Sequence, residues 1–129
     1  MIPLVRFASY KGMPVAQLLE KETLDKVVAD TMVGGATLTK LLGTSAWYAP
    51  GAAAAYVAEA VIRDQKKVVP CSVYLEGEYG ENDICIGVPV VLGRTGWEKV
   101  VDFQLNDEEK ALFKASAEAV RKTNSALNL

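Results

Sequence analysis

Four carboxylates gather around one predicted hairpin turn, at Glu76, Glu78, Glu81 and Asp83. Paired carboxylates can exchange protons with a substrate, and clusters of them can bind calcium. Glu76 and Glu78 share the polar face of one strand, however, and the ligand spacing of a calcium-binding loop is absent. The cluster therefore favours solvated charge beside a tight turn.

The sequence contains no histidine, which excludes Ser-His-Asp and Cys-His mechanisms and histidine-ligated metals within this chain. Two cysteines, Cys71 and Cys85, are too few for a disulfide framework or a zinc site. Both lie in apolar runs, which predicts two buried free thiols in a reducing compartment. Gly34-Gly35 and the Gly93 to Gly96 turn lack the spacing of phosphate-binding loops. The residues themselves thus predict no catalytic group and no metal site.

Length and charge narrow the classes of partner. The chain has 129 residues, which suits one globular domain, and 14 basic against 16 acidic side chains give a net charge of −2. This balance argues against a nucleic acid or an anionic membrane as the main partner. Leu41 to Ala58 carries no charge, but Gly43, Pro50 and its many alanines argue against a membrane-spanning helix.

The first half of the chain is expected to be mainly helical. Pro3 to Val15 predicts two extended pieces around a turn at Lys11-Gly12. Apolar residues from Thr23 to Leu42 recur with a period of 3.6, which predicts an amphipathic helix. Gly34-Gly35 within it predicts a kink or a close backbone approach. Ala46 to Asp64 predicts a second helix, whose first turn can accommodate a proline.

The uncharged segment Gly43 to Ala58 leaves two alternatives open. Its Trp47-Tyr48 pair and its alanines could be hidden in the core of this chain, or they could form an interface with something outside it. Composition and periodicity do not decide between the two.

The second half predicts a small antiparallel sheet and a closing helix. Val69 to Tyr79 and Ile84 to Leu92 alternate in polarity around a turn, and Pro89 favours an edge or a bulge. A third strand is expected over Trp97 to Leu105, and Asn106 caps a final helix. The expected packing stripe of that helix is Leu112, Ala115, Ala119, Val120, Thr123 and Leu127. The fold class is therefore α+β, with long helices packed on a small antiparallel sheet.

These same residues resemble a known family. The strings from Met32 to Ala36 and from Leu41 to Pro50, then Leu75 to Gly80 and Leu105 to Lys110, are similar to the carboxy-terminal half of lactate-dehydrogenase-like malate dehydrogenases. The likeness runs from Met1 to about Leu127, and the segment resembles enzymes of the Bacteroidetes bacteria.

The resemblance implies the carboxy-terminal domain fold of lactate and malate dehydrogenases, over residues 1–129 as a single domain. It implies a cytoplasmic, oligomeric oxidoreductase of the tricarboxylic acid cycle that interconverts malate and oxaloacetate with NAD. In that family an amino-terminal Rossmann half binds NAD, and a histidine and arginines carry catalysis. This chain contains neither the Rossmann half nor the family's catalytic histidine and substrate-binding arginines. Its expected partners are therefore that NAD domain, further copies of itself and the substrate.

Only pocket-lining roles carry over from the family. They place Ser45, Ala46 and Pro50 beside substrate and nicotinamide, where small side chains leave room for a dicarboxylate. The isolated chain is expected to be inactive. Two alternatives stay open: part of a lactate or other 2-hydroxy-acid dehydrogenase, and a non-catalytic interaction module with the same fold.

Overall fold

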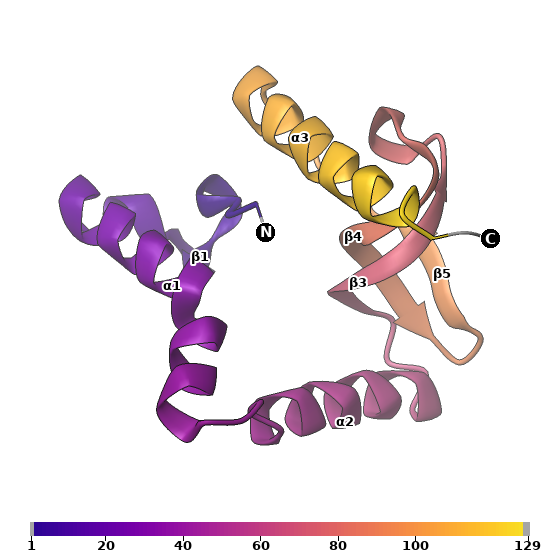
Figure 1. The fold of residues 1–129 in the computed structure, drawn as a ribbon, viewed down its shortest axis with the longest axis horizontal. Coiled ribbons are helices and arrows are strands. Elements are labelled where there is room, and N and C mark those ends of the chain that lie inside the picture. Colours follow the sequence, from indigo (N-terminus) through magenta and orange to yellow (C-terminus); the bar gives the residue numbers. More distant parts are fainter. Residues whose placement is uncertain (1, 128–129) are drawn as a thin grey trace. The chain divides into compact units, whose positions relative to one another are not determined.

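The computed structural model describes residues 2–127 (Figure 1). Met1, where the resemblance begins, and residues 128–129 lie outside the described part. The chain divides into two compact units, Met1–Ala49 and Pro50–Leu129, which are treated separately below. In the described part, no helix has both the length and the apolar character needed to cross a membrane.

The first unit opens with short elements. The 3-10 helices η1 (Val5–Phe7) and η2 (Val15–Gln17) flank the two-residue strands β1 (Ser9–Tyr10) and β2 (Met13–Pro14). The strands pair antiparallel around Lys11 and Gly12, whose φ angles are 49° and 82°. The predicted turn at Lys11-Gly12 is thereby confirmed. Glycine suits it, because glycine adopts this left-handed backbone conformation without strain.

The long helix α1 spans Lys21–Leu42, close to the predicted Thr23 to Leu42. It ends at Gly43, whose φ of 68° makes the left-handed cap that commonly terminates helices. Helix geometry continues through Gly34-Gly35, and a Cβ added at either glycine would meet nothing within 4 Å. The predicted close backbone approach is therefore wrong within the described chain.

Helix α2 spans Tyr48–Ile62, so all but its first two residues belong to the second unit, and it carries Pro50 in its first turn, as expected. Only Ala60 of this helix is buried. Tyr48 is 85% exposed, and Trp47, just before the helix, is 64% exposed. The uncharged segment is therefore not buried within the described chain, which favours the interface alternative.

The sheet of the second unit is the predicted meander. Strands β3 (Lys67–Glu76), β4 (Asn82–Gly93) and β5 (Gly96–Val100) are antiparallel in the order β3-β4-β5. Alternate residues of β3 and β4 make most of the core, as the polarity pattern predicts. The buried apolar residues of these two strands are Val69, Val73, Leu75, Ile84, Ile86, Val88, Val90 and Leu92.

Pro89 does not lie at an edge or a bulge, contrary to the expectation. It sits in the central strand, opposite Pro70, and the irregularity with β5 falls between Val91 and Leu92. The Pro89 carbonyl accepts a hydrogen bond from Val101 N at 2.8 Å, just past the end of β5. The N–H and C=O of one strand residue point toward the same neighbouring strand. The N–H that Pro89 lacks would therefore point to the segment just past Val100, so no hydrogen bond between paired residues of β4 and β5 is lost.

Helix α3 (Asp107–Asn124) closes the unit and contacts β4 (Figure 1). The predicted cap is confirmed as a reciprocal capping box, in which Glu109 N donates to Asn106 Oδ1 and Asn106 N donates to Glu109 Oε2. The predicted stripe is wrong in register. The buried residues are Glu109, Phe113 and Ala117, whereas Leu112 is 48% exposed. The α+β class itself is confirmed.

Candidate functional site

The three predicted pocket residues lie around the connection between α1 and α2. Ser45 is exposed and Ala46 half-buried, both in the first unit, and Pro50 is exposed at the start of the second. The loop that carries Ser45 and Ala46 begins at the Gly43 cap. Neither of the two cavities described below is lined by any of the three. Their role beside substrate stays a prediction.

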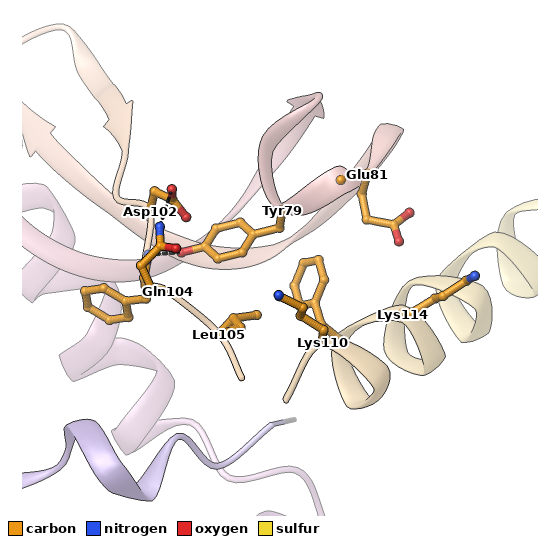
Figure 2. Close-up of a pocket in the computed structure, with 10 residues that line it drawn as sticks. Tyr79, Glu81, Asp102, Gln104, Leu105, Lys110 and Lys114 are labelled. Carbon is orange, nitrogen blue, oxygen red and sulfur yellow. Dashed lines mark hydrogen bonds between the residues drawn. The ribbon is translucent and has the colours of Figure 1, made fainter. Parts of the chain in front are cut away.

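A cavity of about 560 Å³ opens in the second unit (Figure 2). The η3 turn (Glu78–Gly80), the segment after β5 and the first turns of α3 form its walls. It is lined by Tyr79, Gly80, Glu81, Asp102, Phe103, Gln104, Leu105, Lys110, Phe113 and Lys114. Its size falls within the range of small-molecule pockets, so its polar groups decide what it could do.

Tyr79 stands at the centre of this cavity (Figure 2). Its hydroxyl donates to the Val101 carbonyl and accepts from Phe103 N at 3.0 Å, and its ring lies 5.4 Å from that of Phe113. Burial raises the pKa of Tyr79, so the hydroxyl stays protonated at neutral pH. Both hydrogen bonds go to backbone atoms. Tyr79 therefore ties the segment after β5 to the η3 turn and is not available for proton transfer.

The charged groups of the cavity do not form a catalytic relay. Asp102 accepts from Gln104 Nε2 at 2.9 Å, and Lys110 lies 3.7 Å from Asp107 outside the cavity. Lys110 and Lys114 extend from α3 in different directions (Figure 2). The lining residues can hold polar groups, and no hydrogen-bonded acid–base pair is found among those described.

The acidic cluster is more ordered than the solvated reading predicts. Glu78 Oε2 accepts from Glu76 N at 2.7 Å, and this bond with a second backbone bond lowers the pKa of Glu78. Asp83 accepts from Tyr74 at 3.0 Å, which raises the pKa of Tyr74. Glu81, expected to be solvated, is 13% exposed and pairs with an arginine of α3. Within residues 2–127, no three metal-ligating side chains converge.

Sequence reasoning missed the arginine that holds Glu81. Arg121 Nη2 lies 2.8 Å from Glu81 Oε2 and 2.9 Å from the Asn82 carbonyl oxygen. The residues are forty positions apart, so neither periodicity nor a local motif signals the pair. It fastens the last turns of α3 to the β3–β4 turn.

A second, apolar cavity of about 240 Å³ lies in the first unit. We call it the apolar groove. One wall is the face of α1 with Leu24, Val27, Val28, Thr31 and Met32, and the other walls are Pro3, Val5, Ala8, Val15 and Leu19. The sequence contains this stripe of α1, but periodicity does not tell whether such a stripe is covered.

The sequence and the fold are similar to those of known proteins. Residues 1–127 match the lactate/malate dehydrogenase, alpha/beta C-terminal domain, and the chain belongs to this family. Over 127 residues it is 71% identical to a malate dehydrogenase of Bacteroides fragilis, covering 98% of this chain and 41% of that protein. The resemblance found in the sequence is thereby confirmed.

Solved structures agree with the family. The malate dehydrogenase from Salinibacter ruber is 44% identical, with a TM-score of 0.93, covering 96% of this chain and 41% of that one. A lactate dehydrogenase from Eimeria maxima, solved with NADH and oxamate, is 35% identical, with a TM-score of 0.91, covering 96% and 40%. The chain thus spans about two fifths of the length of these relatives.

The described strands do not form the parallel strand-helix-strand unit that binds dinucleotides in Rossmann folds. All strand pairs are antiparallel, so the described sheets have no parallel strand-helix-strand unit, and the turn at Gly93 to Gly96 joins two strands instead of leading into a helix. The described residues therefore contain no Rossmann-type dinucleotide-binding unit, and no hydride-transfer step is assigned to them.

Proposed function

We propose that this chain, over residues 1–129, is the carboxy-terminal domain of a cytoplasmic, oligomeric, NAD-dependent malate dehydrogenase. The complete enzyme converts (S)-malate and NAD⁺ to oxaloacetate, NADH and a proton, as a step of the tricarboxylic acid cycle. The observation that carries this proposal is the 71% identity to a malate dehydrogenase over 98% of the chain. The preceding part of the enzyme binds NAD and supplies the catalytic groups.

Within that enzyme, Ser45, Ala46 and Pro50 line the substrate side of the pocket. None of the three side chains ionises near neutral pH, so they shape the pocket and transfer no proton. Small side chains there leave space for a substrate with two carboxylates. A larger side chain at Ala46 reduces that space.

The experiment is an NADH absorbance assay on the protein encoded by the complete reading frame that contains this chain. Malate should be oxidised with higher kcat/KM than lactate. A preference for lactate or another 2-hydroxy acid would contradict the proposal. It would favour the alternative of a lactate or other 2-hydroxy-acid dehydrogenase, which the similarity to the Eimeria maxima lactate dehydrogenase supports. Absence of any dehydrogenase activity would favour the interaction module.

A pair of variants tests the pocket. Ala46→Leu in the complete enzyme should lower kcat/KM for malate by roughly tenfold or more, since small steric changes in a pocket alter specificity by about 10–200-fold. Ala111→Leu, the same change at an exposed position of α3, is the control and should leave kcat/KM unchanged. Equal effects of the two variants would reject the pocket role of Ala46.

The 129-residue chain alone should give no turnover. Loss of a general base alone removes a factor of roughly 10²–10⁴, and no arginine clamp orients the substrate. Turnover above the enzyme-free blank would mean that this chain contains catalytic groups of its own.

A further inference from the structure

Helix α2 is held to the second unit at one end. Residues 50–56 are all exposed, and the half-buried or buried positions of the helix fall within residues 57–61. At the start of β3, the Lys67 ammonium lies 4.1 Å from the centroid of the Tyr56 ring. Within the second unit, the direction in which α2 leaves the sheet is therefore set by its last turns and by the short connection to β3.

Lys66, in that connection, is the centre of a polar network. Its Nζ lies 2.9 Å from Asp64 Oδ1 and donates to both carboxylate oxygens of Glu98, at 2.6 and 2.7 Å. Asp64 Oδ1 also accepts from Arg94 N at 2.7 Å, and Thr95 Oγ1 donates to Glu98 Oε1 at 3.2 Å. We call these contacts the Lys66 network. They tie the end of α2 to the β4–β5 turn.

The backbone around the Lys66 network is adapted to it. Asp64 and Lys66 have left-handed backbones with φ of 50° and 52°, which residues other than glycine rarely adopt. Glu98 is the residue of β5 that the register shift leaves without a partner in β4, and such bulges redirect side chains. A Cβ added at Gly93 would lie 2.2 Å from Glu98 Oε1 and 2.6 Å from Lys66 Nζ. Strained backbone collects at functional sites, whereas a chance surface ion pair needs none of these features.

A small change at the Lys66 network is amplified at the far end of α2. From Pro50 to Ile62, the last residue of the helix, the distance is about 18 Å at 1.5 Å per residue. A tilt of about 5° at the network would therefore move Pro50 by roughly 1.6 Å. A misplacement of about 1 Å far from the chemistry can slow a reaction about 100-fold.

We propose that Lys66 is a positioning residue, whose network fixes the angle of α2 against the sheet and so holds Pro50 at the substrate pocket. This inference rests on the proposed function, which places Pro50 at that pocket. Lys66 is needed because the network joins one cation to two carboxylates. Without it, Asp64 and Glu98 repel each other and open the connection between α2 and the β4–β5 turn.

Steady-state kinetics of the complete enzyme test the proposal. Lys66→Met should raise KM for malate at least about tenfold and leave KM for NAD within about twofold, because the preceding part of the enzyme binds NAD. Lys66→Arg keeps the cation and should retain most of the affinity for malate. Gly93→Ala should act like Lys66→Met, since the added Cβ displaces both side chains without removing a charge. Arg121→Met, which removes an ion pair remote from α2, is the control and should leave KM for malate unchanged.

A distance measurement separates this proposal from the proposed function. Spin labels at the native Cys85 and at Ala52→Cys, in a 129-residue chain with Cys71→Ser, report the direction of α2 against the sheet. Low micromolar concentration and an excess of unlabelled chain remove distances between copies. Pulsed electron paramagnetic resonance should give a distance distribution at least about twice as wide for Lys66→Met as for Lys66, because local attachment limits such motion. Arg121→Met should leave the width unchanged.

Two results would overturn the proposal. One is an equal distance distribution with Lys66 and with Lys66→Met. The other is a KM for malate that Lys66→Met leaves unchanged or that Arg121→Met raises equally. A complete enzyme that does not oxidise malate, together with a distribution that Lys66→Met broadens, would reject the proposed function, while the positioning of α2 by Lys66 would stand.

Discussion

The guanidinium of Arg121 lies 2.8 Å from the carboxylate of Glu81, joining the last turns of α3 to the β3–β4 turn. The Glu81 side chain is 13% exposed and that of Arg121 is 36% exposed, so water screens this pair less than a surface pair. Arg121 also donates to the Asn82 carbonyl oxygen. The pair is therefore a tertiary contact that helps to close the second unit.

Removing one partner should destabilise the chain. Glu81→Gln should lower the free energy of unfolding by about 1–2 kcal/mol, the range for hydrogen bonds to charged groups reduced for partial exposure. Urea unfolding followed by far-ultraviolet circular dichroism measures it, and a double-mutant cycle with Arg121→Met isolates the coupling. Glu118→Gln, on the exposed side of α3, is the control and should change the free energy of unfolding by less than about 0.5 kcal/mol. Zero coupling would contradict the pairing.

Both thiols should be free, and Cys85 should react first. In the β3–β4 register Cys71 faces Val88 and Tyr74 faces Cys85, so the cysteines are about 10 Å apart along the strands, beyond disulfide reach. Cys85 is exposed and Cys71 half-buried, which corrects the expectation that both are buried. Alkylation without reductant should add two adducts by intact mass. A mass two daltons low with no adduct would contradict this register.

The Asp64 carboxylate, held by the Lys66 ammonium and the Arg94 backbone N–H, should make the second unit less stable in acid. Asp64 Oδ1 lies 2.9 Å from Lys66 Nζ and accepts from Arg94 N at 2.7 Å. The Lys66 hydrogen bond, then the Arg94 backbone bond, lowers the pKa of Asp64 below its ordinary 3.8. A lowered carboxyl pKa gives stability that is present above the ordinary value and lost as pH falls through the folded value.

A carbon-13 titration should therefore show the Asp64 carboxyl protonating below pH 3.8. Lys66→Gln should move the midpoint upward, while Lys122→Gln on α3 should leave it in place. The Glu98 hydrogen bond, then that of Asp64, raises the pKa of Lys66 above 10.5, so the cation persists throughout this acid range. An Asp64 midpoint indifferent to Lys66→Gln would reject the contact.

The isolated chain should self-associate through α2. Tyr48 and Ile62 are 85% and 76% exposed, and apolar surface in contact with water favours association at about 25 cal/mol per Å². Ala53→Glu should shift the chain to monomer in light scattering at high micromolar concentration. Lys99→Glu, at an exposed position of β5, is the control and should leave the oligomer unchanged.

Two outcomes would contradict this prediction. One is a monomeric chain before any substitution. The other is an oligomer that Ala53→Glu and Lys99→Glu affect equally, because the contact would then lie on another face.

Local sequence patterns predicted most helices and strands of the second unit, but they could not predict contacts between residues far apart in the sequence. Alternation in β3 and β4 and the Asn106 cap depend on neighbouring residues, so they could be inferred. The buried face of α3 was misplaced because its apolar residues are too evenly spread for periodicity to select Phe113 over Leu112.

The candidate site was harder to predict. Charge-free composition suggested that α2 is hidden, but composition does not distinguish a core from a surface that needs a partner. The Tyr79 clamp likewise joins residues more than twenty positions apart. Ser45, Ala46 and Pro50 came only from the family resemblance.

The proline pair between β3 and β4 has a consequence for strand addition. Pro89 directs its backbone toward β5, so its partner Pro70 directs its own toward the open side of β3. In the described residues β3 pairs with β4 alone, and such an open edge is a template for amyloid-like stacking. Pro70 removes one donor from the middle of that template and places a rigid ring there. The ring thus hinders strand addition at the β3 edge, one of the two outer edges of the meander in the described residues.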